Sequence, residues 1–99
     1  MLKAEEVVEL YRKKKDLDYE IALLEYKREN ERQSLGDAGI KDISNQMDSK
    51  RKEREFFENE AAKREVTLSR EERSRLEMLL APIYKEHRER MVGIGRDKH

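Results

Sequence analysis

The basic residues of this sequence are the ones whose type and spacing could bind the charged groups of a partner. Arginine and lysine contact phosphate oxygens, and arginine offers two parallel donors from its planar guanidinium group. Acidic residues interleave with the basic runs, and the chain carries 23 basic against 23 acidic residues. Nucleic acid, or an acidic protein, is therefore expected only as an alternative partner. The residues that would make such contacts are Arg12, Lys13, Lys15, Lys50, Arg51, Arg70 and Arg73.

The other residue types that carry chemistry are too sparse to build a site. His87 is the one internal histidine, and the sequence contains no cysteine. A lone histidine with no second histidine or cysteine nearby is a poor metal ligand set. No nucleophile has a base at a catalytic spacing, and no glycine-rich phosphate loop is present. We therefore predict no catalytic, cofactor-binding or metal-ligating residue, no enzyme activity and no small-molecule substrate.

The composition predicts long, thin helices rather than a thick core. The chain has 99 residues, of which 46% are charged and 35% hydrophobic. Such a chain is one small all-α domain that buries a narrow stripe on each helix. No apolar run approaches the roughly 18 residues of a membrane span, and no leader opens the chain, so we expect a cytoplasmic protein without membrane contact.

Two long helices are predicted to form an elongated, coiled-coil-like antiparallel hairpin. The first covers about residues 3–34 and the second about residues 45–66. An ordered turn over 35–44 joins them, because it contains two glycines and three large aliphatic residues. Tyr19 and Leu23 widen the apolar face of the first helix, so this helix can contact more than one neighbour.

The register of this hairpin follows from where the chain folds back. A pivot near residue 39 places Ile21 opposite Phe57 and Leu17 opposite Ala61, so that the best apolar patches of the two helices coincide. The predicted hairpin core is Leu17, Ile21, Leu24, Phe57 and Ala61.

A third amphipathic helix is predicted over about residues 70–92. Ser69, followed three residues later by Glu72, is typical of a capping box, in which each residue satisfies a free backbone N–H of the other. Pro82 removes one backbone donor inside the helix and predicts a kink between two half-helices. Glycines end the helix, and residues 93–99 are expected to form a frayed tail.

The third helix carries the densest apolar face of the chain. Its apolar residues recur in steps of three and four, which places them on one side of a helix. We expect this face to be too extensive for its own chain to cover, so that another molecule buries it. The predicted self-association residues are Leu76, Leu79, Leu80, Ile83, Tyr84 and Met91.

Two adjacent phenylalanines give a second argument for association. Phe56 and Phe57 point about 100° apart on a helix, so one can enter the hairpin seam while the other needs a second surface. A dimer would supply that surface. In the competing arrangement, the third helix folds back over Phe56 within a monomer.

We conclude from the sequence that the chain is a non-catalytic helical module for protein–protein interaction or assembly, with a homodimer favoured. Its high content of charged residues and its predicted helices are also typical of phage or mobile-element regulatory and adaptor proteins, although these general features do not establish function. Two alternatives stay open. One is a nucleic-acid-binding regulator or DNA-packaging component, and the other is a protein inhibitor of a host enzyme.

Overall fold

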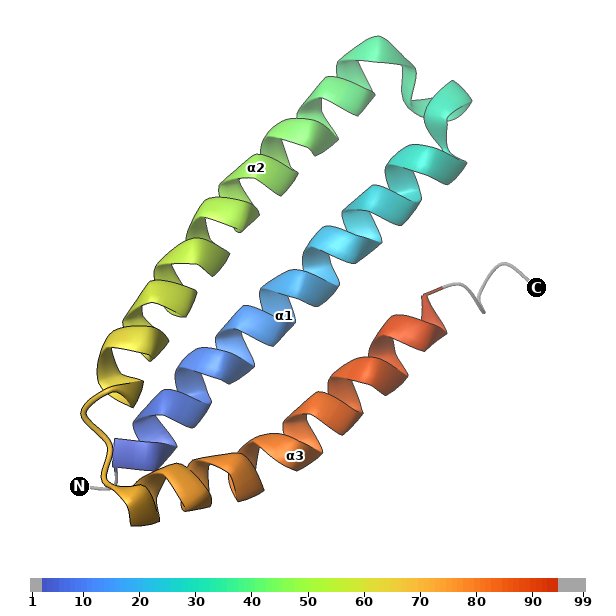
Figure 1. Cartoon of the computed structure of the whole chain (residues 1–99). Helices are drawn as coiled ribbons and strands as arrows, with labels where there is room; N and C mark the ends of the chain where they lie inside the picture. Colours follow the sequence, from blue (N-terminus) through green and yellow to red (C-terminus); the bar gives the residue numbers. More distant parts are fainter. Residues whose placement is uncertain (1–2, 95–99) are drawn as a thin grey trace.

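The computed structural model describes residues 3–94, and it consists of three α-helices with short connections (Figure 1). Helix α1 spans Lys3–Asn30, α2 spans Arg32–Glu65 and α3 spans Arg70–Gly93. Every regular element of the described residues is helical, which confirms the predicted all-α class. None of the helices in this part of the chain is long and apolar enough to cross a lipid bilayer. The predicted tail lies outside the described residues from position 95 onward.

The chain reverses direction at Gly36, which interrupts the helical backbone within the bounds of α2. The predicted reversal near residue 39 is therefore three residues too late. Gly36 has φ 68° and ψ 179°, a conformation that is open to glycine and strained for a residue with a Cβ atom. The helical path resumes directly after it, so the predicted turn over 35–44 is wrong. Gly39 lies inside the helix, where a Cβ would stand 2.9 Å from the Leu35 Cβ. Gly39 therefore allows Leu35 to pack closely against the helix backbone, and it does not form the turn.

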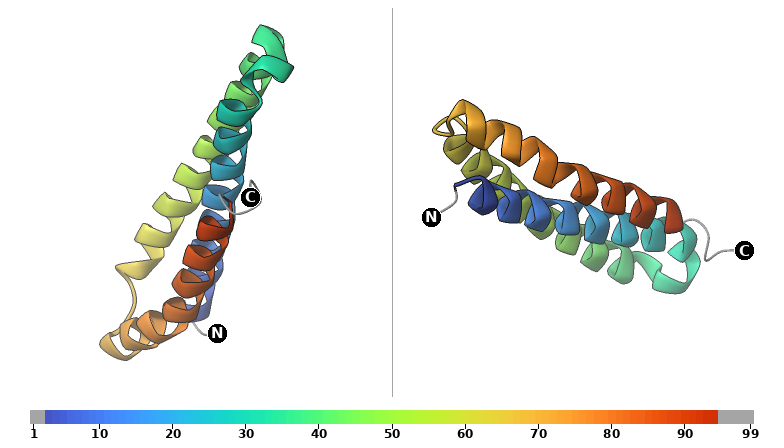
Figure 2. Two further views of the ribbon diagram at one scale, coloured as in Figure 1. Left: turned by 90° about the vertical axis from the view of Figure 1, so that its right-hand side faces the viewer. Right: turned by 90° about the horizontal axis from the view of Figure 1, so that it is seen from below.

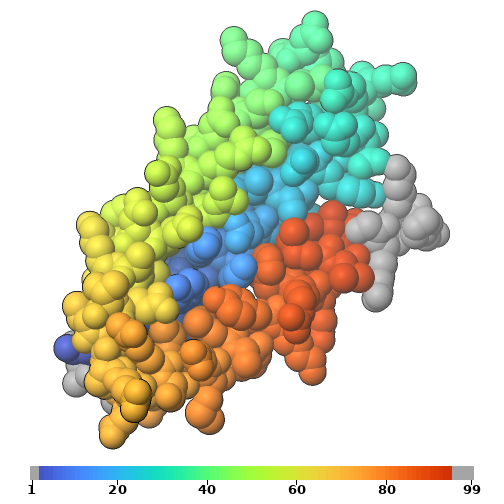
Figure 3. Space-filling view, viewed as in Figure 1, coloured from blue at the N-terminus to red at the C-terminus, as the bar shows by residue number. Residues whose placement is uncertain are grey.

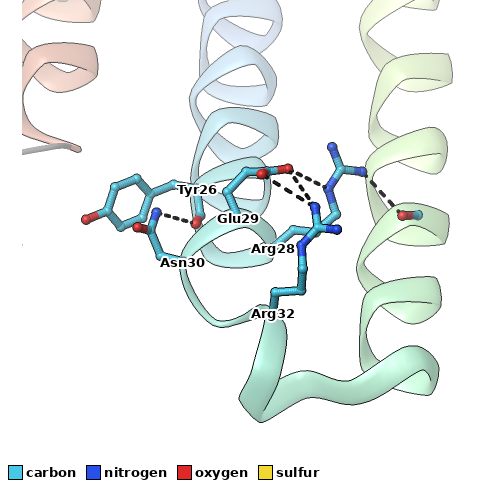
Figure 4. Close-up of polar contacts among 6 residues, drawn as sticks. Tyr26, Arg28, Glu29, Asn30 and Arg32 are labelled. Carbon is cyan, nitrogen blue, oxygen red and sulfur yellow. Dashed lines mark hydrogen bonds and ion pairs between the residues drawn. The ribbon is translucent and has the colours of Figure 1, made fainter.

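Polar contacts hold the end of the hairpin beside this reversal (Figure 4). The guanidinium of Arg28 on α1 donates from Nη1 to Ser44 Oγ on α2, at 3.3 Å. The Glu29 carboxylate accepts from Arg32 Nη2 at 3.4 Å. The Arg28–Ser44 contact joins the two helices directly, so it helps to define which residues of α1 and α2 lie side by side.

The earlier pivot shifts the register of the hairpin by nearly two helical turns from the predicted one. Asp18 Oδ1 on α1 pairs with Arg54 Nη1 on α2 at 3.0 Å. Ile21 packs in one cluster with Met47 and not opposite Phe57. In the observed register the completely buried Met47 side chain, which is flexible, packs beside Ile21. The predicted register placed the aromatic ring of Phe57 at that position.

The predicted hairpin residues still point into the molecule, but several meet different partners. Ala61 packs with Val7 and Val8 near the start of α1, and not opposite Leu17 as predicted. Of the five predicted core residues, the three that are buried are Leu17, Ile21 and Ala61. The two that are partly buried are Leu24 and Phe57.

Helix α3 starts at the predicted N-cap. Ser69 Oγ accepts a hydrogen bond from the Glu72 backbone N–H at 3.2 Å. The Glu72 carboxylate differs from the prediction, because its Oε2 accepts from the backbone N–H of Ala4 on α1 at 3.1 Å. That N–H is one of the first-turn donors that have no partner within their own helix. A carboxylate of α3 therefore caps α1.

Helix α3 continues through Pro82 as one helix, and Figure 1 shows it bending along its length. Proline has no N–H, so one hydrogen bond of the helical ladder is missing there. The predicted division into two half-helices is thus replaced by a single bent helix.

Helix α1 lies between the other two helices, as the views in Figures 1 and 2 show. It packs against both α2 and α3, whereas α2 and α3 barely touch each other. The backbone extends over 52 × 28 × 16 Å, so the three helices form a flat layer. Figure 3 shows α1 (blue) at the floor of an open seam between the yellow end of α2, which is otherwise green, and the orange start of α3, which is otherwise red. The main core joins all three helices and the α2–α3 connection through Ala4, Val7, Val8, Ala61, Leu68, Leu76 and Leu80.

Candidate protein interface

The apolar face of α3 packs against α1 of its own chain. Leu76 and Leu80 are 2% and 7% exposed, and they share a core cluster with Val7 and Val8. The expectation that the chain cannot cover this face by itself therefore does not hold for these two leucines. Their burial has a simple cause: α1 presents one apolar edge to α2 and a second edge to α3.

The other predicted self-association residues are covered to different degrees. Three of them, Leu79, Ile83 and Tyr84, pack partly buried against the same core. Met91 lies nearer the end of α3 and is 36% exposed. The residues predicted to bind a second chain thus mainly hold α3 on α1, and self-association itself stays a prediction.

The phenylalanine pair occupies two environments, as their angular separation on the helix predicts. Phe57 is partly buried between α2 and α1, whereas Phe56 is 58% exposed. Their ring centroids lie 5.6 Å apart with the planes at 68°, an edge-to-face contact. The Lys13 ammonium lies 5.5 Å from the Phe57 centroid. Helix α3 folds back over α1 and leaves Phe56 uncovered.

These two rings line a groove of about 570 Å³ between α1 and α2, which we call the aromatic groove. Leu17 contributes an aliphatic side chain beside the two rings. Five charged residues of both signs also line the groove, and we call them its rim, so an occupant would meet apolar and charged side chains together. The rim residues are Lys13, Asp16, Glu20, Lys52 and Glu53.

A second cleft, of about 310 Å³, lies between α1 and α3 and has a different chemistry. Arg90 Nη1 on α3 pairs with Asp16 Oδ1 at 2.9 Å, and its guanidinium carbon lies 4.0 Å from the Tyr19 ring centroid. Between the same two helices, the Lys15 ammonium on α1 lies 5.1 Å from the Tyr84 ring centroid on α3. Cations thus lie over aromatic faces where α1 meets α3, and these contacts hold the two helices together.

His87 lines the same cleft, and its Nδ1 atom is buried without a hydrogen-bond partner. Burial lowers the pKa of His87 below its ordinary value, and the nearby Lys15 and Arg90 cations lower it further. Asp18 and Asp16 act in the opposite direction on the same pKa.

A partly buried tyrosine links α1 to the end of α2. The Tyr11 hydroxyl donates to Glu65 Oε2 at 2.8 Å. Burial raises the pKa of Tyr11, and both this hydrogen bond and the Glu65 charge raise it further. Burial likewise raises the pKa of Tyr84 on α3, and Glu65 adds to that effect. Both hydroxyls therefore remain protonated across the physiological range, and Tyr11 acts as a structural donor.

The seven basic residues predicted to contact nucleic acid or an acidic partner are distributed over all three helices. Four of them are in ion pairs, and Lys13 lies over the Phe57 ring. Arg70 and Arg73 lie at the start of α3, where Arg73 lines the seam toward α2. The structure therefore does not gather these cations into one strip. The paired residues are Arg12 with Glu9, Lys15 with Asp18, Lys50 with Glu20, and Arg51 with Asp48.

Several of these contacts could not be read from the sequence. The Glu72–Ala4 cap and the Arg90–Asp16 pair join residues that are 68 and 74 positions apart. The one signal available was the widened face of α1 at Tyr19, which predicted a second neighbour without naming it.

The described residues contain no group of three His, Asp or Glu side chains placed to hold a metal ion. No protein-family model, curated protein or solved structure shows significant similarity to this chain.

Proposed function

We propose that this chain is a non-catalytic helical module for protein–protein interaction, and that it self-associates through the aromatic groove. The observation that carries the proposal is Phe56, which is 58% exposed beside Phe57 and Leu17 in a groove that α3 leaves open. An exposed aromatic side chain beside other apolar side chains, in a groove that charged residues also line, is the usual form of a binding hot spot.

The free energy available at this ring favours association. Full burial of a phenylalanine side chain stabilises a contact by about 1.5–3 kcal/mol, and Phe56 has more than half of its surface left to bury. Its edge-to-face contact with Phe57 limits the orientations of the ring, so less rotamer freedom is lost when a partner covers it.

The charges on the rim support a second copy of the chain as the occupant. Lys13 and Lys52 line the groove with Glu53, while Asp16 and Glu20 already pair with Arg90 and Lys50, so a two-fold related copy can place the two lysines opposite Glu53. The chain has a formal net charge of zero, and two copies therefore approach each other without long-range repulsion.

A stable dimer requires more contact than the groove alone provides. A typical interface buries about 800 Å² on each partner, and the described protein exposes 7248 Å² in total. Roughly a ninth of the surface must be covered. The neighbouring exposed faces of α1 and α2 therefore take part in the proposed interface.

The test is solution mass measured by light scattering over roughly a hundredfold range of protein concentration. We expect a dimer for the natural chain and a monomer of unchanged helicity for Phe56→Ser. Val92→Ser is the matched control, because Val92 is 57% exposed but lies on α3, away from the groove. A natural chain that stays monomeric throughout, or a Phe56→Ser variant that dimerises normally, would contradict the proposal.

The same experiment with added duplex DNA separates the nucleic-acid alternative. Binding that collapses between about 50 and 200 mM salt would favour that alternative, because counterion release makes phosphate contacts strongly salt-dependent. The ion pairs made by four of the seven candidate cations argue against it. A cytoplasmic location stays a prediction, and the lack of cysteine is compatible with it.

A further inference from the structure

The contact between α1 and α3 contains a polar atom that nothing satisfies. His87 Nδ1 on α3 is buried without a hydrogen-bond partner, at the edge of the cleft between these helices. A neutral imidazole tolerates this position by carrying its proton on Nε2, which leaves Nδ1 as an unused acceptor. Protonation would turn Nδ1 into a buried donor with no acceptor, and that arrangement costs more.

The charges around His87 come from both packed helices. Lys15 lies on α1 and Arg90 lies one turn along α3, and both disfavour a third positive charge. Asp16 and Asp18 favour it, but each already has a basic partner, Asp16 in Arg90 and Asp18 in Arg54. The charged groups that line the cleft or act on His87 are Arg12, Lys15, Asp16 and Asp18 from α1, and Glu86 and Arg90 from α3.

Pro82 separates α3 into a firmly held part and a weakly held part. Before it, Leu76 and Leu80 are buried, and Arg75 Nη2 pairs with Glu5 Oε1 on α1 at 2.8 Å. After it, none of the described residues of α3 belongs to the buried core, and residues 83–93 contact α1 through partly buried side chains, the Arg90–Asp16 ion pair and the cleft that contains His87. Proline also deprives the Met78 carbonyl of its usual helical donor, so the helix bends most easily between these two parts.

We propose that protonation of His87 releases the part of α3 after Pro82 from α1, so that this contact is a pH-sensitive joint. The docked form binds fewer protons than the released form, because the pKa of His87 is lowered when α3 lies on α1. The contact is therefore at full strength above about pH 6.5, the ordinary histidine pKa, and it weakens as the pH falls below that value.

The direct test is amide hydrogen exchange measured by NMR between pH 7 and 5.5, corrected for the intrinsic pH dependence of exchange. Ordinary carboxylates remain charged over this range. We expect amides of residues 84–93 to lose protection as the pH falls, while amides of residues 70–80 and of the α1–α2 hairpin keep theirs. The loss should follow from the two His87 acid dissociation constants, in the docked and released forms, and it approaches their ratio only at a pH below both pKa values; the imidazole proton titration measures these constants independently.

His87→Gln should abolish this pH dependence, because an amide side chain does not titrate. His99→Gln removes the other histidine of the chain and should leave the pH dependence intact. If His87→Gln does not fold, Lys15→Gln provides the second variant: removal of this cation should shrink the loss of protection. Unchanged protection at residues 84–93 in the natural chain, or the same pH response after His87→Gln, would overturn the proposal.

Discussion

Replacement of Leu76 by alanine tests directly whether the apolar face of α3 is an internal contact. Leu76 is 2% exposed and packs in the core that joins α1, α2 and α3. The substitution removes three carbon atoms, and the lost transfer free energy is about 2.4 kcal/mol at about 0.8 kcal/mol per carbon. We expect it to destabilise the folded chain even when the protein is dilute.

The cavity left by Leu76→Ala adds only a modest further cost. Leu76 also borders the seam between α2 and α3, a hollow of about 460 Å³ into which neighbouring side chains can relax. The total loss should therefore be about 3 kcal/mol, in the lower half of the usual range for buried leucines. For a domain of this size, that loss lowers the Tm by about 12–24 °C.

Urea unfolding followed by circular dichroism measures this loss, with Met78→Ala as the control. Met78 lies two residues away on the same helix and is 76% exposed, so its truncation should change stability by less than about 0.5 kcal/mol. Two results would refute the reasoning. One is a loss for Leu76→Ala that is no larger than the control. The other is a fully stable variant whose mass has fallen from dimer to monomer, which would place Leu76 in a contact between chains.

Two further predictions concern the backbone. Gly36→Ala should destabilise the fold by about 1–3 kcal/mol through strain alone, because a Cβ at Gly36 meets nothing within 4 Å. Gly93→Ala is the control, because a Cβ at Gly93 also meets open space but the residue is helical. This control should stabilise the folded chain by up to about 1 kcal/mol. Equal effects of the two substitutions in thermal unfolding would show that the reversal does not depend on the backbone conformation of Gly36. Ser69→Ala should cost about 1 kcal/mol by removing the side-chain acceptor of the first turn of α3. Normal stability of that variant in the same assay would show that this hydrogen bond contributes nothing.

The helices themselves could be predicted because their signals are local. Apolar residues in steps of three and four define the third helix, and Ser69 caps it as its sequence context indicates. The all-α class and the antiparallel pairing of the first two helices follow from these signals, and both are present in the structure. The position of the reversal does not follow from them.

The register depended on a choice between two glycines three residues apart. Only Gly36 has a positive φ, whereas Gly39 is helical and makes room for Leu35. Both glycines fit the local rules for a turn, so nothing near them in the sequence identifies the pivot. The choice is made by distant packing, in which Met47 and Ile43 cover Ile21.

The second face of α1 was hard to recognise for a different reason. Its contacts with α3 use Lys15 over Tyr84 and Arg90 over Tyr19, and an apolar pattern includes the two tyrosines but not the two cations. The buried stems of such side chains pack like hydrocarbon while their charges stay near water. A stripe that alternates aromatic and basic residues can therefore hold two helices together without an apolar pattern.

The carboxylate that caps the first helix has a consequence for how the protein is made. Glu72 is translated 68 residues after the Ala4 amide that it satisfies, an interval of roughly 3–14 s at ordinary elongation rates. During this interval Val7 and Val8 on α1 lack the leucines of α3 that cover them in the folded protein. Helix α3 is therefore the element that completes the packing at the start of α1.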